Sequence, residues 1–348
     1  MTSKIQLSRR AKSASDHGEH IDQATAEFAS LVGRLGFYPR ESVLFTWLRS
    51  GSEVLVQRVD LDVDLDVGMD FNRWLESVLA PVEAYEPQEV RLSIVCSESG
   101  FNKAATIQMM EACLLEKGIS VSSGTSVCAL ELTDGSVVHG VWTTECSECC
   151  EDWHVATEFA SDGIHMLRSR EELTEQFSYQ VTRAINPELI KKVMGRQVAA
   201  KDRWRTNQLR LIVKCIQSET DTSDLVATRM AYALSDVRVR DTLLWDLASG
   251  SLDAHIVLER LTGLIPRLTG EWVAGFICVA AVAAWLQGNG VTANMCVDRA
   301  LEEAPDNNLA NLLRVSLNNG ISPQLWVESV LELSREECRY GVPLAQIP

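Results

Sequence analysis

Three cysteines and one histidine lie close together in the chain: Cys146, Cys149, Cys150 and His154. Proteins hold zinc with four ligands, mostly thiolate sulfur and imidazole nitrogen, and a Cys-x-x-Cys turn presents two thiolates to one ion. Cys146 and Cys149 have this spacing, His154 could supply a third ligand, and Cys150 or the distant His139 could complete the set. The segment is therefore a candidate zinc site.

Two other interpretations of this cysteine cluster stay open. A Cys-x-x-Cys pair can exchange thiols and disulfides, but acidic neighbours disfavour the reactive thiolate: Glu145, Glu148, Glu151 and Asp152. Zinc signatures usually combine two separated ligand pairs, whereas Cys149 and Cys150 are adjacent and point in different directions. We therefore expect buried or structural cysteines and no bound cofactor, with zinc as the alternative.

A short loop is a second candidate site. Ser97, Ser99 and Gly100 follow a predicted buried strand at 90–95 and precede a predicted helix at 102–117. Loops at the carboxyl ends of strands often bind ligands, and a helix N-terminus favours anions. The chain nevertheless has no Walker motif, dinucleotide glycine pattern or nucleophile elbow. The three residues are candidates for ligand binding, and an ordinary strand–helix turn is the simpler interpretation.

The third candidate is a basic stretch at 183–214. It contains nine Lys or Arg residues and two acidic residues, although the whole chain has a net charge of −16. We expect one long helix that begins near Pro187, because proline suits the first turn of a helix. Such a helix could bind an acidic partner or phosphate, or it could be a solvated helix that pairs with the acidic remainder. The candidate partner-binding residues here are Lys201, Arg203 and Arg205.

A second charged segment contains Arg238 and Arg240, which are also candidates for partner binding. Arginines two positions apart on a helix face in different directions. One of them could pair with Asp236 or Asp241 while the other points outwards. The alternative to partner binding is a structural ion pair between helices.

Length and charge limit the class of protein. A net charge of −16 over 348 residues opposes general binding to nucleic acid or anionic membranes. The longest apolar run, 272–286, is shorter than the roughly 20 residues that a membrane helix needs. No signal peptide is evident, so we expect a cytoplasmic protein with a protein partner and no membrane partner. Nucleic acid is disfavoured overall, although the basic stretch leaves it open.

The order of predicted elements indicates an α/β fold followed by an all-α region. Strand patterns occur at 43–48, 54–59, 90–95, 127–132 and 137–143, and helices at about 21–35, 70–79 and 102–117. After the cysteine cluster the strand patterns stop, and helices follow, including predicted ones at 271–287, 291–304 and 323–338. We predict a mixed sheet with flanking helices, and then a helical bundle.

We expect three parts along the chain. Residues 1–18 form a disordered arm, 19–165 an α/β domain that ends in the cysteine cluster, and 166–348 a helical domain packed on the first. Within the helical domain, Ala281, Ala293, Ala300 and Pro305 have the spacing of a tetratricopeptide helix pair. Generic packing of two helices through small residues explains the same pattern.

Several motifs, in order along the chain, resemble those of one family. They are Leu-Gly-Phe-Tyr-Pro-Arg-Glu-Ser-Val-Leu at 35–44, Arg-Val-Asp-Leu at 58–61, Trp142 with the cysteines, Ser-Arg-Glu-Glu-Leu at 169–173, Leu-Ser-Asp-Val-Arg-Val-Arg-Asp at 234–241, Ala-Trp-Leu at 284–286 with Gly288, and Asp-Arg-Ala-Leu at 298–301. The chain resembles the actinobacterial family of domain of unknown function 4192. The resemblance implies one architecture from about 24 to 326. It transfers no catalytic residue. Glu151 to His154 replace the family's Pro-Pro-Glu-Gly-like turn.

Two classes of function follow. The first, which we favour, is a non-enzymatic protein-interaction or regulatory scaffold that uses the helical half as a docking surface. The second is a metal-dependent or thiol-dependent enzyme, or a small-ligand binder. Its site would lie near the cluster at 146–150 and the loop at 97–100.

Overall fold

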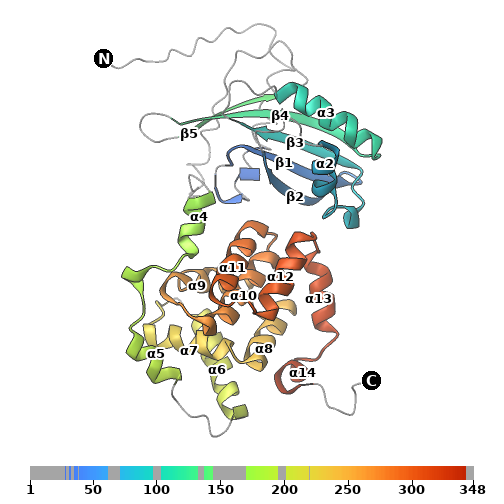
Figure 1. Cartoon of the computed structure of the whole chain (residues 1–348). Helices are drawn as coiled ribbons and strands as arrows, with labels where there is room; N and C mark the ends of the chain where they lie inside the picture. Colours follow the sequence, from blue (N-terminus) through green and yellow to red (C-terminus); the bar gives the residue numbers. More distant parts are fainter. Residues whose placement is uncertain are drawn as a thin grey trace, which may run out of the picture. The chain divides into compact units, whose positions relative to one another are not determined.

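A computed structural model of the chain describes residues 28, 31–32, 35–37, 39–61, 71–96, 103–131, 137–143, 170–194, 201–218 and 220–341. The chain divides into two compact units, Met1–Arg170 and Glu171–Pro348 (Figure 1). The sequence placed this boundary between residues 165 and 166. The expected arm at 1–18 lies outside the described residues, and the expected packing of one domain on the other stays a prediction.

The first unit contains a five-stranded mixed sheet in the order β2-β1-β3-β4-β5 (Figure 1). The strands are β1 (Ser42–Arg49), β2 (Ser52–Asp60), β3 (Glu89–Val95), β4 (Ser120–Glu131) and β5 (Val137–Thr143). Only the β3–β4 pair is parallel. Helix α3 (Lys103–Glu116) connects those two strands, because parallel neighbours need a crossover. The predicted mixed sheet is confirmed.

One face of this sheet packs against α3 and α2 (Phe71–Leu79). Phe45 and Trp47 on β1 are fully buried there and stack with ring centroids 5.3 Å apart. Trp47 Nε1 donates to Gln57 Oε1 at 3.0 Å, and Gln57 Nε2 donates to the Val78 carbonyl at 3.0 Å. This relay joins β1, β2 and α2 and satisfies the polar atom of a buried tryptophan.

The second unit is helical. Its helices are α4 (Arg170–Phe177), α5 (Pro187–Met194), α6 (Lys201–Ile216), α7 (Asp224–Leu234), α8 (Val237–Ala248), α9 (Ala254–Thr262), α10 (Ala274–Leu286), α11 (Gly290–Glu303), α12 (Asn308–Asn318), α13 (Pro323–Leu331) and α14 (Arg335–Tyr340). The short 3₁₀ helices η4 (Val181–Arg183), η5 (Ile265–Arg267) and η6 (Glu271–Val273) connect some of them, and η2 (Glu83–Tyr85) lies in the first unit. The expected order, α/β followed by all-α, is confirmed.

Helix α10 is the centre of the helical unit. Its residues from Ala274 to Trp285 are all buried, and it packs closely against α11. Three alanines of these two helices are buried: Ala281, Ala293 and Ala300. Their small side chains let the two helices approach each other closely. A Cβ atom at Gly275 would lie 2.3 Å from the Leu234 carbonyl oxygen, so only glycine fits at this crossing.

Two helix predictions are wrong in their boundaries. The basic stretch forms two helices, α5 and α6, in place of one long helix. In the sequence, Gly195 lies between these two helices, and glycine is a poor helix former. The helix predicted at 323–338 is divided into α13 and α14. Ser334 and Glu337 form a capping box at the start of α14, which begins a new helix there.

No helix in the described part of the chain combines the length and apolar character that a membrane crossing requires.

Candidate functional site

Two of the predicted sites lie outside the described residues. These are the cysteine cluster with Cys146, Cys149, Cys150 and His154, and the loop with Ser97, Ser99 and Gly100. Within the described ranges, no three His, Cys, Asp or Glu side chains are grouped so that they could hold a metal ion. The zinc and loop hypotheses therefore stay predictions, and the described candidate site lies in the helical unit.

Arg205, a predicted partner-binding residue, is part of a structural ion pair. Its Nε donates to Asp236 Oδ1 at 2.9 Å and its terminal nitrogen to Asp236 Oδ2 at 3.0 Å. Asp236 is also the N-cap of α8, where it accepts from the Arg238 amide at 3.0 Å. Lys201 Nζ lies 3.7 Å from the same carboxylate. Arg205 thus joins α6 to the start of α8, and its charge is neutralised.

The arginines of α8 are also engaged. Arg240 donates to the neighbouring Asp241 at 2.8 and 3.0 Å. The Arg238 guanidinium packs against Gly341, where an added Cβ would lie 2.6 Å from its terminal nitrogen. One of these two arginines was expected to pair with Asp236 or Asp241, and Arg240 does pair with Asp241, but this pair lies within one helix and does not join two helices. Arg203 is exposed.

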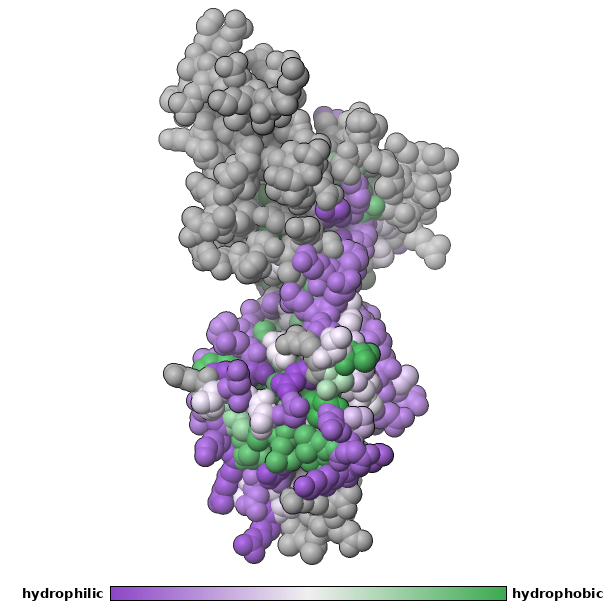
Figure 2. Space-filling model, turned by 90° about the vertical axis from the view of Figure 1, so that its left-hand side faces the viewer, coloured by the Kyte–Doolittle hydropathy of each residue, from purple (hydrophilic) through white to green (hydrophobic). Residues whose placement is uncertain are grey.

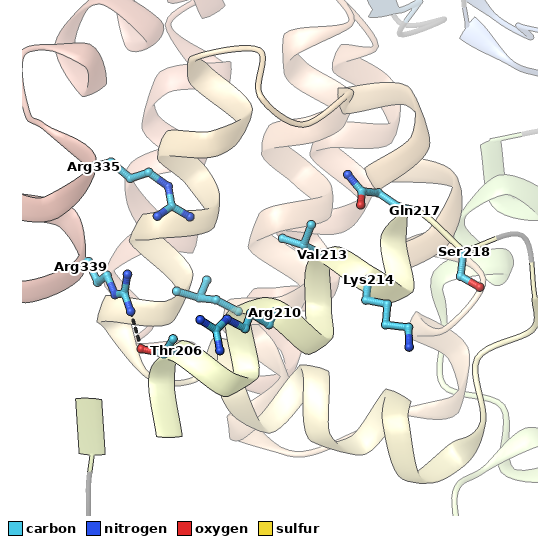
Figure 3. Close-up of a pocket in the computed structure, with 9 residues that line it drawn as sticks. Thr206, Arg210, Val213, Lys214, Gln217, Ser218, Arg335 and Arg339 are labelled. Atoms are coloured by element: carbon cyan, nitrogen blue, oxygen red, sulfur yellow. Dashed lines mark hydrogen bonds between the residues drawn. The ribbon is translucent and has the colours of Figure 1, made fainter. Parts of the chain in front are cut away.

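The structure places the candidate site further along α6. A groove of about 730 Å³ lies between α6 and α14 (Figure 3), and both helices pack against α8. It is lined by Thr206, Leu209, Arg210, Val213, Lys214, Gln217, Ser218, Arg335 and Arg339. Four of these described lining residues are cations, and none is Asp or Glu. The groove is thus a local positive surface on a chain with a net charge of −16.

Arg335 fastens the α14 wall of the groove. It donates to both oxygens of the buried Asp246 on α8, at 2.6 and 2.9 Å. This hydrogen-bonded pairing raises the pKa of the Arg335 guanidinium, so the residue stays charged. Trp245 Nε1 adds a hydrogen bond of 2.9 Å to the Leu333 carbonyl. The wall is therefore held to α8 by the Arg335–Asp246 ion pair and by the hydrogen bond from the Trp245 side chain to the Leu333 carbonyl.

The other three cations of the groove have no carboxylate partner among the described residues. Arg339 donates to the Thr206 hydroxyl and lies 5.0 Å from the centre of the Tyr340 ring. Its Nε is buried and donates to no partner within the described structure. Arg210 and Lys214 are exposed, and neither forms an ion pair with a described residue. In Figure 3, the arginines of the groove lie near its Thr206 end: Arg210, Arg335 and Arg339. We call Arg210, Lys214 and Arg339 the free cations.

None of the four cations that line the groove was singled out from the sequence. Arg210 and Lys214 lie in the predicted basic stretch but were not singled out within it. Arg335 was missed because the predicted helix at 323–338 continued through it, and Arg339 lies just beyond the predicted end of that helix. The available signal was Ser334-x-x-Glu337, a capping-box pattern that marks the start of a separate helix.

Comparison with known proteins gives one match. No curated protein and no solved structure is significantly similar to the chain. The family model described as Domain of unknown function (DUF4192) matches residues 28–324, which include α6 and α8 and end before α14. This match covers most of the chain and agrees with the order of motifs in the sequence. The chain therefore belongs to the DUF4192 family.

Proposed function

We propose that the protein is a non-enzymatic interaction protein of the cytoplasm that binds an acidic segment of a partner protein in the groove between α6 and α14. The observation that carries this proposal is the set of three free cations. Other arginines of the helical unit, such as Arg205 and Arg335, are paired with aspartates. A carboxylate from a partner would neutralise charge that the described part of this chain leaves unpaired.

The overall charge favours a compact acidic segment over nucleic acid. Duplex DNA carries one negative charge per about 1.7 Å of its axis, and its phosphates would extend beyond the groove. The remainder of this acidic chain would repel those phosphates. A short segment with a few carboxylates can lie entirely within the positive region.

The packing below the groove suits a docking scaffold. Helix α8 packs on the central helix α10, whose described neighbours include α11. We take α10 and α11 to be a tetratricopeptide-like pair, as the spacing of their buried alanines indicates. Such a base would hold the groove in one shape, so that a partner is bound without reorganising the site.

The surface of the helical unit also supports a protein partner. One face shows an apolar area between polar residues (Figure 2). Large apolar side chains are exposed on this unit, among them Val181, Leu225, Leu312, Val315 and Leu325. Exposed apolar patches are typical of surfaces that contact other proteins.

Binding of fluorescent poly-L-glutamate to the full chain, followed by fluorescence anisotropy, tests the proposal. The wild-type chain should bind at low salt, and its affinity should fall at physiological salt, where charges are screened over about 8 Å. The double variant Arg210→Glu with Lys214→Glu should bind at least about tenfold more weakly, since it reverses two of the charges that the probe contacts.

The matched control is Lys117→Glu with Lys192→Glu. These two exposed cations lie outside the groove, and the change in net charge is the same. Equal loss of binding in both double variants would contradict the proposal, because affinity would then follow net charge. Tighter binding of a mixed-sequence DNA duplex, dependent on Arg210 and Lys214, would identify the groove as a nucleic-acid site and would also contradict it.

A further inference from the structure

The residues that α6 contributes to the groove repeat once per helical turn. Leu209 and Arg210 are followed by Val213 and Lys214, and Gln217 and Ser218 continue this spacing just past the end of α6. An apolar row, Leu209 and Val213, therefore runs beside a cationic row on the same helix. Helix α14 adds Arg335 and Arg339, which are also one turn apart, on the opposite wall. The groove thus has an apolar centre with cations on both sides.

Hydrogen-bond acceptors are scarce along this groove. Arginine and lysine side chains only donate hydrogen bonds, and leucine and valine do neither. The Thr206 hydroxyl already contacts Arg339 and the Asp202 carbonyl. The Ser218 hydroxyl already contacts Thr220. Among the side chains of the described lining residues, only the Gln217 amide oxygen is an acceptor without a hydrogen-bond partner in the described structure.

This lack of acceptors decides which backbone conformation can lie in the groove. An extended segment brings one backbone N–H per residue, and an N–H that loses water without gaining an acceptor costs free energy. A helix pairs its own N–H groups internally. A helix also presents an apolar face and two flanking faces at the same time, whereas a strand presents two opposite faces.

We infer that the ligand of the groove is an amphipathic acidic helix of a partner protein. Its apolar stripe contacts Leu209 and Val213, and Asp or Glu residues on one or both flanks contact the free cations. This inference rests on the proposed function and adds the conformation and the residue pattern of the partner. From Thr206 to its end at Ile216, α6 runs for about 15 Å along the groove, so the groove takes about ten residues of ligand helix.

A displayed library of random peptides of about 16 residues, long enough for that helix, tests the inference. The full chain is the bait, and the variant with Arg210→Glu and Lys214→Glu is the counter-selection. We expect the surviving peptides to be rich in Asp and Glu, to carry apolar residues at helical spacing, and to lack proline in the middle. Selected peptides should bind the wild-type chain at least about tenfold more tightly than this groove variant.

Two further measurements make the outcome decisive. A central proline, which breaks a helix, should reduce the affinity of a selected peptide at least about tenfold. The control chain with Lys117→Glu and Lys192→Glu should bind as the wild-type chain does.

The two ideas fail in different ways. Acidic survivors that have no apolar periodicity, and that tolerate the central proline, would overturn the helix inference and leave the proposed function standing. Survivors that are not acidic, or that bind the groove variant as tightly as the wild-type chain, would overturn both.

Discussion

Arg335 and Asp246 are 89 positions apart in the sequence, and Arg335 Nε donates to Asp246 Oδ1 at 2.6 Å. Asp246 is buried on α8, whereas Arg335 begins α14. This contact places the last described helix of the chain against the core of the helical unit. Together with the Trp245 hydrogen bond to the Leu333 carbonyl, it holds α14 on α8, where α14 forms one wall of the groove.

Removal of the carboxylate should loosen α14. We expect Asp246→Ala to lower the free energy of unfolding by about 2 kcal/mol, since it removes two hydrogen bonds to a charged group. Urea unfolding measures this loss, and hydrogen exchange should show faster exchange over residues 335–340. The control is Glu336→Ala, on an exposed residue of the same helix, which should change stability by less than about 0.5 kcal/mol. Equal effects of the two substitutions would contradict a fastening role for Asp246.

The pair of Arg205 and Asp236 should be structural. In a double-mutant cycle with Arg205→Ala and Asp236→Asn, we expect a coupling energy of about 1–2 kcal/mol in the free energy of unfolding, because both residues form two charge-assisted hydrogen bonds. The cycle separates this pairing from the N-cap role of Asp236. A coupling energy near zero would show that the side chains separate in solution and that Arg205 is available for a partner.

The stability of the helical unit should depend on pH through Glu303. Burial by itself would raise the pKa of this carboxyl, but hydrogen bonds from the Gly270 amide and Thr269 hydroxyl, together with Arg299, outweigh burial and lower the pKa. The Thr269 hydroxyl donates at 2.8 Å and the Gly270 amide at 2.5 Å. Because the folded pKa is depressed, the stabilisation is complete above the unfolded value of about 4.3 and is lost as pH falls through the folded pKa.

Glu303→Gln tests this pH dependence. The wild-type chain should be more stable than the variant at pH 7, and the difference should shrink as pH falls below the unfolded pKa of about 4.3 and through the depressed folded pKa of the wild-type carboxyl. Urea unfolding at several pH values provides the measurement. A stability difference that stays constant down to the acid limit would show that the charge of Glu303 is not what stabilises the loop at Thr269 and Gly270.

Two cysteines of the helical core should be unreactive. Burial raises the pKa of the Cys278 thiol to about 12, and it raises the pKa of the Cys296 thiol further. The thiolate is the reactive form, so iodoacetamide at pH 8 should leave both residues unmodified until the chain is unfolded. Mass spectrometry of the native and the urea-unfolded protein locates the label. Rapid labelling of either residue in the native chain would mean that α10 and α11 open readily.

The cysteine cluster should not hold zinc. We expect elemental analysis of the purified chain to find much less than one zinc per molecule, because we expect the side chains of adjacent Cys149 and Cys150 to point in different directions and not to share one tetrahedral ion. Cys149→Ser should then leave the metal content unchanged. Stoichiometric zinc that this substitution removes would favour the metal-dependent alternative.

The sequence by itself determined the architecture. Alternating apolar residues predicted the strands, and the end of strand patterns after the cysteine cluster predicted the change to helices. These signals are local, since each depends on the spacing of residues within one element. The basic stretch was visible for the same reason.

Only the tertiary structure decided which cations are free. Arg205 and Arg210 are five positions apart on one helix and look alike in the sequence. Arg205 meets Asp236, 31 positions away, whereas Arg210 faces the groove. Arg335 and Arg339 reach the same groove from the end of the chain because Asp246, 89 positions earlier, holds α14 there. Such partners depend on which helix faces pack together, and the spacing of residues within one helix carries no information about the helix it packs against.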